Sequence, residues 1–100
     1  MGLVRFSSDT SVVATKNQVY SELDGEAVIL HLSSGTYYGL NAAGAHIWDM
    51  LRQPRKVAEI LAEMLDRFEV DSDRCERDLI GLLQRLSDEG LIEVVHEADT

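Results

Sequence analysis

The stretch EAVILHLSSGTYYGL, residues 26–40, limits the possible fold more than any other part of the chain. Residues 26–32 are apolar at both alternating sets of positions, and a strand of this kind is usually covered on both faces. The next three residues, 33–35, are Ser-Ser-Gly, which suits a turn. Residues 36–40 begin with β-branched and aromatic side chains, as strands often do. The stretch therefore predicts a β-hairpin that other elements must cover.

Two shorter strands are predicted ahead of this hairpin. Residues 11–14 are short and apolar, and residues 19–23 alternate apolar and polar side chains as a half-exposed strand does. The dipeptide at 24–25 is Asp-Gly, a strong hairpin signal. These strands are expected to continue into the hairpin as one antiparallel meander. Residues 36–40 would then form an edge strand, unless the N-terminal segment covers that edge.

Three helices are predicted after the sheet. The first is capped by Asn41 and runs to about residue 52, where the following Gln-Pro ends it. The second covers about 55–68 and has an uninterrupted helical apolar pattern. The third covers about 73–89 and ends at a glycine. A short extended stretch, 91–95, is expected to return to the core.

One apolar side chain of the predicted third helix departs from the others. The rest fall within a single arc at about 100° per residue: Cys75, Leu79, Leu82, Leu83 and Leu86. Ile80 lies roughly 100° round from Leu79 and shares its face with Asp73, Glu76 and Gln84. Two interpretations of Ile80 stay open: it lines a binding surface, or it packs under the N-terminal segment.

Length and charge narrow the class of protein. One hundred residues fit one small domain, with residues 1–10 as a lead-in and 96–100 as a polar tail. The formal net charge of −9 opposes binding to a phosphate backbone. No apolar run approaches the length of a membrane span. The single cysteine offers no disulfide framework, which favours the cytoplasm.

The sequence carries no recognisable catalytic or metal-binding pattern. His31, His46 and His96 have no ligand spacing among them, and no glycine-rich phosphate loop is present. No Ser-His-Asp or Cys-His arrangement can be argued from order or spacing. We therefore expect no enzyme activity, no cofactor and no metal, and favour a binding module.

Two classes of binding module fit a sheet followed by three helices. A winged-helix nucleic-acid binder is one, but its third helix should be basic. Here that helix opens with Asp71, Asp73, Glu76 and Asp78 against only two arginines. The other class captures an extended peptide by strand addition at an open sheet edge.

A series of motifs then follows at fixed spacing: YYGLN at 37–41, IW..L at 47–51, and V.EI....L..F.VD at 57–71. Further along, D....L..L...GLIE extends to about residue 93. This order resembles the PqqD-like family, also called RiPP recognition elements, over nearly the whole chain. The Ser-Ser-Gly turn at 33–35 favours the stand-alone type found with lasso peptides over the type that serves PQQ synthesis.

The resemblance implies an α+β, winged-helix-like fold, in which a three-stranded antiparallel sheet, extendable by one N-terminal strand, precedes three helices. It also implies that the protein binds the leader peptide of a ribosomally made precursor and presents it to a leader peptidase and a cyclase. The leader would lie as an added strand in the cleft between the sheet edge and the third helix. Nucleic acid and membrane are not expected partners.

The residues expected to form that cleft come from both of its walls. On the sheet, the edge backbone would come from Thr36, Tyr37, Tyr38 and Gly39, and the groove floor from Val28 and Leu30. On the third helix the candidates are Asp73, Glu76, Ile80, Leu83 and Gln84. Two alternatives stay open. Residues 27–32 could be the pairing strand, and the two tyrosines could serve only strand packing.

Overall fold

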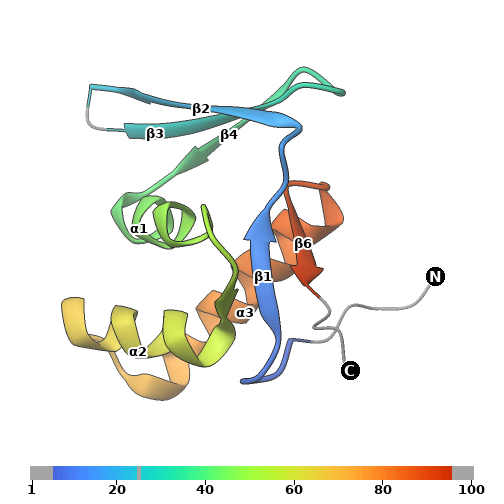
Figure 1. The fold of residues 1–100 in the computed structure, drawn as a ribbon. Coiled ribbons are helices and arrows are strands. Elements are labelled where there is room, and N and C mark those ends of the chain that lie inside the picture. The colour runs from blue at the N-terminus through green and yellow to red at the C-terminus, as the bar shows by residue number, and fades with distance from the viewer. Residues whose placement is uncertain (1–5, 25, 96–100) are drawn as a thin grey trace.

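The computed structural model describes residues 6–24 and 26–95 (Figure 1). Along the chain the elements are β1 (Ser11–Ala14), β2 (Gln18–Leu23), β3 (Glu26–His31), β4 (Thr36–Leu40), α1 (Ala42–Met50), β5 (Arg55–Lys56), α2 (Val57–Arg67), α3 (Ser72–Asp88) and β6 (Ile92–Val95). All four expected strands up to residue 40, the three helices and the late extended stretch are present. The predicted lead-in to residue 5 and the polar tail lie outside the described residues.

The strands form two small antiparallel sheets. One has the order β2-β3-β4, which confirms the predicted hairpins and makes β4 an edge strand. The second has the order β5-β1-β6. The expectation that β1 would join the meander is therefore wrong. With β6 on one side and β5 on the other, β1 places its backbone groups between two partners rather than at a sheet edge.

The short strand β5 also corrects the start of the second helix. Residues 55–56 were expected to be helical, but they pair with β1 instead. Lys56 has extended backbone angles, φ −77° and ψ 147°, and donates its N–H to Glu59 Oε1 at 3.0 Å. This contact satisfies one of the unpaired donors at a helix start, so α2 begins at Val57.

One core joins both sheets and all three helices. Val12 of β1 and Ile29 of β3 are both fully buried in it. α1 lies between the β2–β3–β4 sheet and α2 (Figure 1) and contributes the buried side chains of Ile47 and Trp48. α3 contributes Leu79, Leu83 and Leu86. Ile80, which the sequence places off this stripe, is half-buried and packs against the same core.

The β2–β3–β4 sheet is covered on one face only by the described residues. Ala27 and Ile29 point to the core and are buried. On the opposite, outer face, Val28 and Leu30 are half-buried, Val19 is 48% exposed and Tyr37 is 69% exposed. The expectation that the central strand is covered on both faces is therefore wrong. A mostly uncharged sheet face is left open to solvent.

Side-chain caps fix where the helices begin. Asn41 Oδ1 accepts the N–H of Gly44 at 2.8 Å at the start of α1, as predicted. Asp71 accepts the N–H of Arg74 at 3.2 Å at the start of α3. Gly90, with φ 75°, follows the end of α3 in the left-handed region that favours glycine. Within the described residues, no helix is long and apolar enough to cross a membrane.

The buried position of Leu83 yields a stability prediction. Leu83→Ala should lower the free energy of unfolding by about 2–5 kcal/mol, because it leaves a cavity in a fully packed core. Leu32→Ala makes the same change at a side chain that is 51% exposed and should stay within about 0.5 kcal/mol of the parent. Urea denaturation of both variants measures the difference, and equal losses would contradict the core assignment.

Candidate functional site

A broad hollow of about 1050 Å³ opens beside β4, between that strand and the helices. β4 contributes Gly39 and Leu40, and the C-terminal end of α2 contributes Met64 and Phe68. α1 and the linker before α3 add Asn41, Ala43, Gly44, Ile47, Glu69, Val70 and Asp71. α3 forms the longest wall, with Arg74, Cys75, Arg77, Asp78, Leu79, Gly81, Leu82 and Arg85.

The backbone of β4 is open along one edge. Leu32, just past β3, donates its N–H to the carbonyl of the residue before β2. Because backbone groups alternate sides along a strand, Ile29 turns its own groups the other way, toward β4. Ile29 lies opposite Tyr38 in the register, so Tyr38 bonds within the sheet. Its neighbours Tyr37 and Gly39 therefore direct their N–H and C=O groups toward the open edge.

A side-chain hydrogen bond joins this strand to α3. The hydroxyl of Tyr38 donates to Glu89 Oε1 at 2.5 Å, at the C-terminal cap of α3. The same bond to a carboxylate raises the pKa of Tyr38 above its ordinary value, because the carboxylate stabilises the protonated phenol. The contact joins β4 to the C-terminal end of α3.

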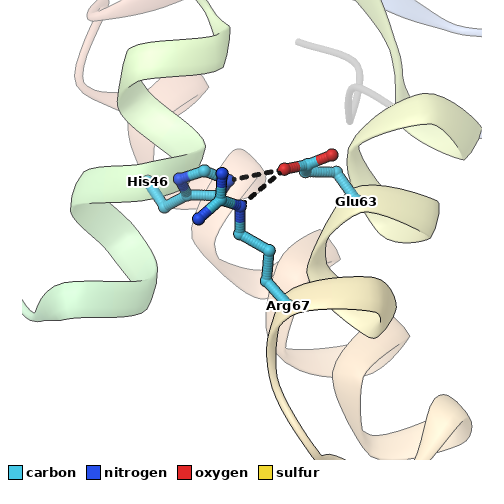
Figure 2. Close-up of polar contacts among 3 residues, drawn as sticks. All are labelled: His46, Glu63 and Arg67. Carbon is cyan, nitrogen blue, oxygen red and sulfur yellow. Dashed lines mark hydrogen bonds and ion pairs between the residues drawn. The ribbon is translucent and has the colours of Figure 1, made fainter.

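A second polar cluster holds α1 to α2 near the opposite wall (Figure 2). Glu63 Oε2 accepts from Arg67 Nε at 2.8 Å and lies 3.1 Å from His46 Nε2. The His46 ring also meets Phe68 edge to face, with ring centroids 6.3 Å apart. Phe68 lines the hollow, so this cluster helps to position an apolar part of its wall.

The residues predicted for the sheet wall are only partly at the hollow. Gly39 lines it. Thr36, Tyr37 and Tyr38 belong to β4, as expected for an edge strand, but their side chains are not part of the lining. Val28 and Leu30 lie on the outer face of the sheet and do not floor the hollow. β3 is bonded on both sides, so the alternative that it forms the pairing edge is wrong.

The residues predicted for the helix wall lie elsewhere on α3. None of Asp73, Glu76, Ile80 and Gln84 lines the hollow. At about 100° per residue, their face and the lining face flank the buried stripe on opposite sides. Leu83 is fully buried in the stripe itself and has no exposed area to offer. Whether any of these side chains contacts a peptide stays a prediction.

Sequence reasoning missed the charged residues that do line the hollow. All three arginines of α3, Arg74, Arg77 and Arg85, face it, while Asp73 and Glu76 face away. With three acidic side chains also in the lining, its formal charge is balanced, although the chain carries −9. A helical wheel separates Arg74 and Arg85 from the acidic flank, whereas Arg77 lies at the border, about 40° from Asp73.

Metal-ligating side chains are scattered over the described residues rather than clustered. No group of three or more His, Cys, Asp or Glu side chains gathers among them in a way that could hold an ion. Cys75 is partly buried, and desolvation raises the pKa of its thiol, which lowers its reactivity.

The site as a whole consists of the open edge of β4 beside the hollow. An arrangement of this kind can accept an extended peptide chain.

Comparisons with known proteins agree with this geometry. The family model for coenzyme PQQ synthesis protein D (PqqD) matches residues 26–92. A structure described as TbiB1 in complex with the TbiA(beta) leader peptide is 34% identical, with a TM-score of 0.72, and the match covers 87% of this chain and 99% of that one. The comparison with curated proteins gave no significant match.

Two further structures are more distant in sequence and support the fold alone. A lasso peptide synthetase B1 complexed with the leader peptide is 24% identical, with a TM-score of 0.72 and coverage of 82% of this chain and 96% of that one. The PqqD truncation of Methylobacterium extorquens PqqCD, described as a RiPP recognition element, is 15% identical, with a TM-score of 0.76 and coverage of 93% and 99%.

The Glu63 cluster predicts a pH-dependent stability. The hydrogen bond from Arg67, and then that from His46, holds the pKa of Glu63 below its ordinary value near 4.5. A lowered carboxylate pKa stabilises the fold above that ordinary value, and the stabilisation is lost as the pH falls through the folded-state pKa. Glu63→Gln should therefore lose stability at pH 7 and converge with the parent near pH 3.

Urea denaturation at the two pH values measures this difference. Glu76→Gln is the control, because Glu76 makes no ion pair with the described residues. A Glu63→Gln variant as stable as the parent at pH 7 would mean that the cluster does not stabilise the fold.

Proposed function

Because this chain belongs to the PqqD family, we propose that it binds the leader of a ribosomally made, lasso-type precursor peptide and presents it to the enzymes that process the precursor. The protein acts as an adaptor without catalysis of its own. It meets the newly translated precursor in the cytoplasm. The relative that is 34% identical is described in complex with the TbiA(beta) leader peptide.

The open edge of β4 beside the hollow is the observation that carries this proposal. An extended peptide can bond to the outward backbone groups of Tyr37 and Gly39 as a fourth strand of the sheet. Its side chains then alternate, and every second one points into the hollow toward α3. Five residues of β4 span roughly 17 Å, which is enough for two or three side chains to enter.

The outer face of the β2–β3–β4 sheet supports a second contact, with the leader peptidase. Val19, Leu30 and Tyr37 lie in one row of the register across the three strands, and Val19 and Tyr37 are exposed. A leader strand added at β4 would extend this same face. A peptidase docked there would touch both protein and leader, and so would prefer the loaded form.

Leader binding is the first prediction of this proposal. The leader of the precursor encoded beside this gene should bind with a dissociation constant of about 10 nM to 1 μM, or about −11 to −8 kcal/mol. The core part of the precursor should bind weakly or not at all. Isothermal titration calorimetry measures both, and millimolar binding of the leader would contradict the proposal.

Backbone methylation of the leader separates strand addition from other binding modes. An N-methyl group on an amide that bonds to β4 removes a donor and blocks the edge, whereas one on the next amide points away. The affinity should therefore fall with a period of two along the bound segment. A uniform loss, or none, would mean that the leader is not an added strand.

A nucleic-acid-binding regulator is the competing function, and it has its own test. The net charge of −9 and the acidic side chains on the outer flank of α3 oppose phosphate contacts. Titration with duplex DNA at low salt should show no salt-sensitive binding in the micromolar range. Such binding would favour the regulator over the adaptor.

Two valines of equal exposure test whether the leader binds at the hollow and the peptidase at the outer face of the β2–β3–β4 sheet. Val19 on the outer face and Val70 in the lining of the hollow are both 48% exposed. Val19→Asp should weaken peptidase binding at least about tenfold and leave leader affinity within about twofold, because it charges only the outer face. Val70→Asp should weaken leader binding instead. Biolayer interferometry with purified peptidase, with and without leader, measures both.

The same experiment tests the preference for the loaded form. Equal peptidase affinity with and without leader would contradict the coupling between the two surfaces. If Val19→Asp bound the peptidase as the parent does, the outer face would not be its docking site.

A further inference from the structure

Three residues of the α3 wall form one row along the hollow. Arg77, Gly81 and Arg85 are spaced four residues apart, so they lie one above another on a helix, within an arc of roughly 80°. All three are exposed and line the hollow. The row faces the space that an added strand at β4 would enter.

Gly81 has no explanation within the described fold. It lies in the middle of α3, where glycine is less favourable than alanine because it leaves the unfolded chain more freedom. Its φ is not positive, and a Cβ built there would meet no atom within 4 Å. Nothing in the described protein therefore requires a glycine at this position. A close approach from outside would require it.

The two arginines of the row also differ from their neighbour. Arg74 lies 3.9 Å from the Asp78 carboxylate. Arg77 and Arg85 make no ion pair or side-chain hydrogen bond with the residues that the structure describes. In a chain with a net charge of −9, two arginines without such a partner in a concave wall are available to an incoming carboxylate.

The spacing of this row matches that of a strand. Arg77 and Arg85 are about 12 Å apart along the helix axis. In a strand, side chains on one face repeat about every 6.8 Å, so three successive inward side chains span about 13.6 Å. The middle one would lie over Gly81 when the outer two lie near the arginines.

We propose that the row Arg77–Gly81–Arg85 selects leaders in which a large side chain, seated over Gly81, is followed or preceded two residues away by an aspartate or glutamate. The carboxylate pairs with Arg77 or Arg85, and the missing Cβ lets the large side chain lie against the helix. This inference deepens the proposed function and rests on it.

A charge scan of a defined peptide tests the selection. The probe is the TbiA(beta) leader peptide, with single-residue variants in which each position in turn is Glu, Gln or Lys. Fluorescence anisotropy should find at least one position where the Glu variant binds at least about fivefold more tightly than the Lys variant. Arg77→Glu or Arg85→Glu should reverse that preference at the same position.

Arg52→Glu is the matched control, because it makes the same change of net charge at an exposed arginine outside the lining. It should leave the ratio of Glu to Lys affinities within about twofold. An equal shift in this control, or no charge preference at any position, would overturn the inference and leave leader binding intact. No binding of any probe to the parent protein, together with no calorimetric binding of the leader encoded beside this gene, would overturn the proposed function as well.

The glycine is tested by opposite effects on stability and binding. Gly81→Ala should raise the melting temperature by about 2–6 °C, because alanine is the better helix residue and no atom blocks its Cβ. The same variant should weaken leader binding at least about threefold, and Gly81→Leu should weaken it further. A variant that is more stable and binds as the parent does would overturn the role of Gly81.

Discussion

Burial of one face of α3 is the constraint on which the rest of the structure depends. Leu79, Leu83 and Leu86 are nearly or fully inaccessible, and the same core holds Val12 from one sheet and Ile29 from the other. Because the stripe must face that core, the two flanks of α3 are fixed in direction. One flank becomes a wall of the hollow beside β4, and the other carries the acidic residues.

Local sequence patterns were sufficient for most elements but not for their partners. The hairpin at 26–40 and the three helices follow from periodicity and turn residues. β1 is only four residues long, and its pattern suits a meander as well as a separate sheet. Its place is decided by β5 and β6, which are about 40 and 80 residues further along. A contact over such separations leaves no signature in the strand itself.

Of the two walls of the site, the sequence predicted the β4 wall but not the α3 wall, because the second depends on a contact between distant parts of the chain. The edge position of β4 follows from its place at the end of a meander, and Gly39 was expected and found at the hollow. The face of α3 that lines the hollow could not be predicted. The buried stripe of α3 has a flank on each side, and the sequence does not say which flank β4 approaches. The off-stripe Ile80 suggested one flank. The Tyr38–Glu89 contact and the lining of the hollow lie with the other.

The open edge of β4 also has a consequence for the protein's own solubility. An edge that accepts a peptide strand accepts any strand, including the β4 of another copy. Two copies that approach edge to edge bring their −9 charges together, and this repulsion acts as a barrier to stacking. High salt or mild acid would lower that barrier. The acidity of the chain thus protects the free protein against edge-to-edge dimerisation through β4, which would block the edge that the peptide needs.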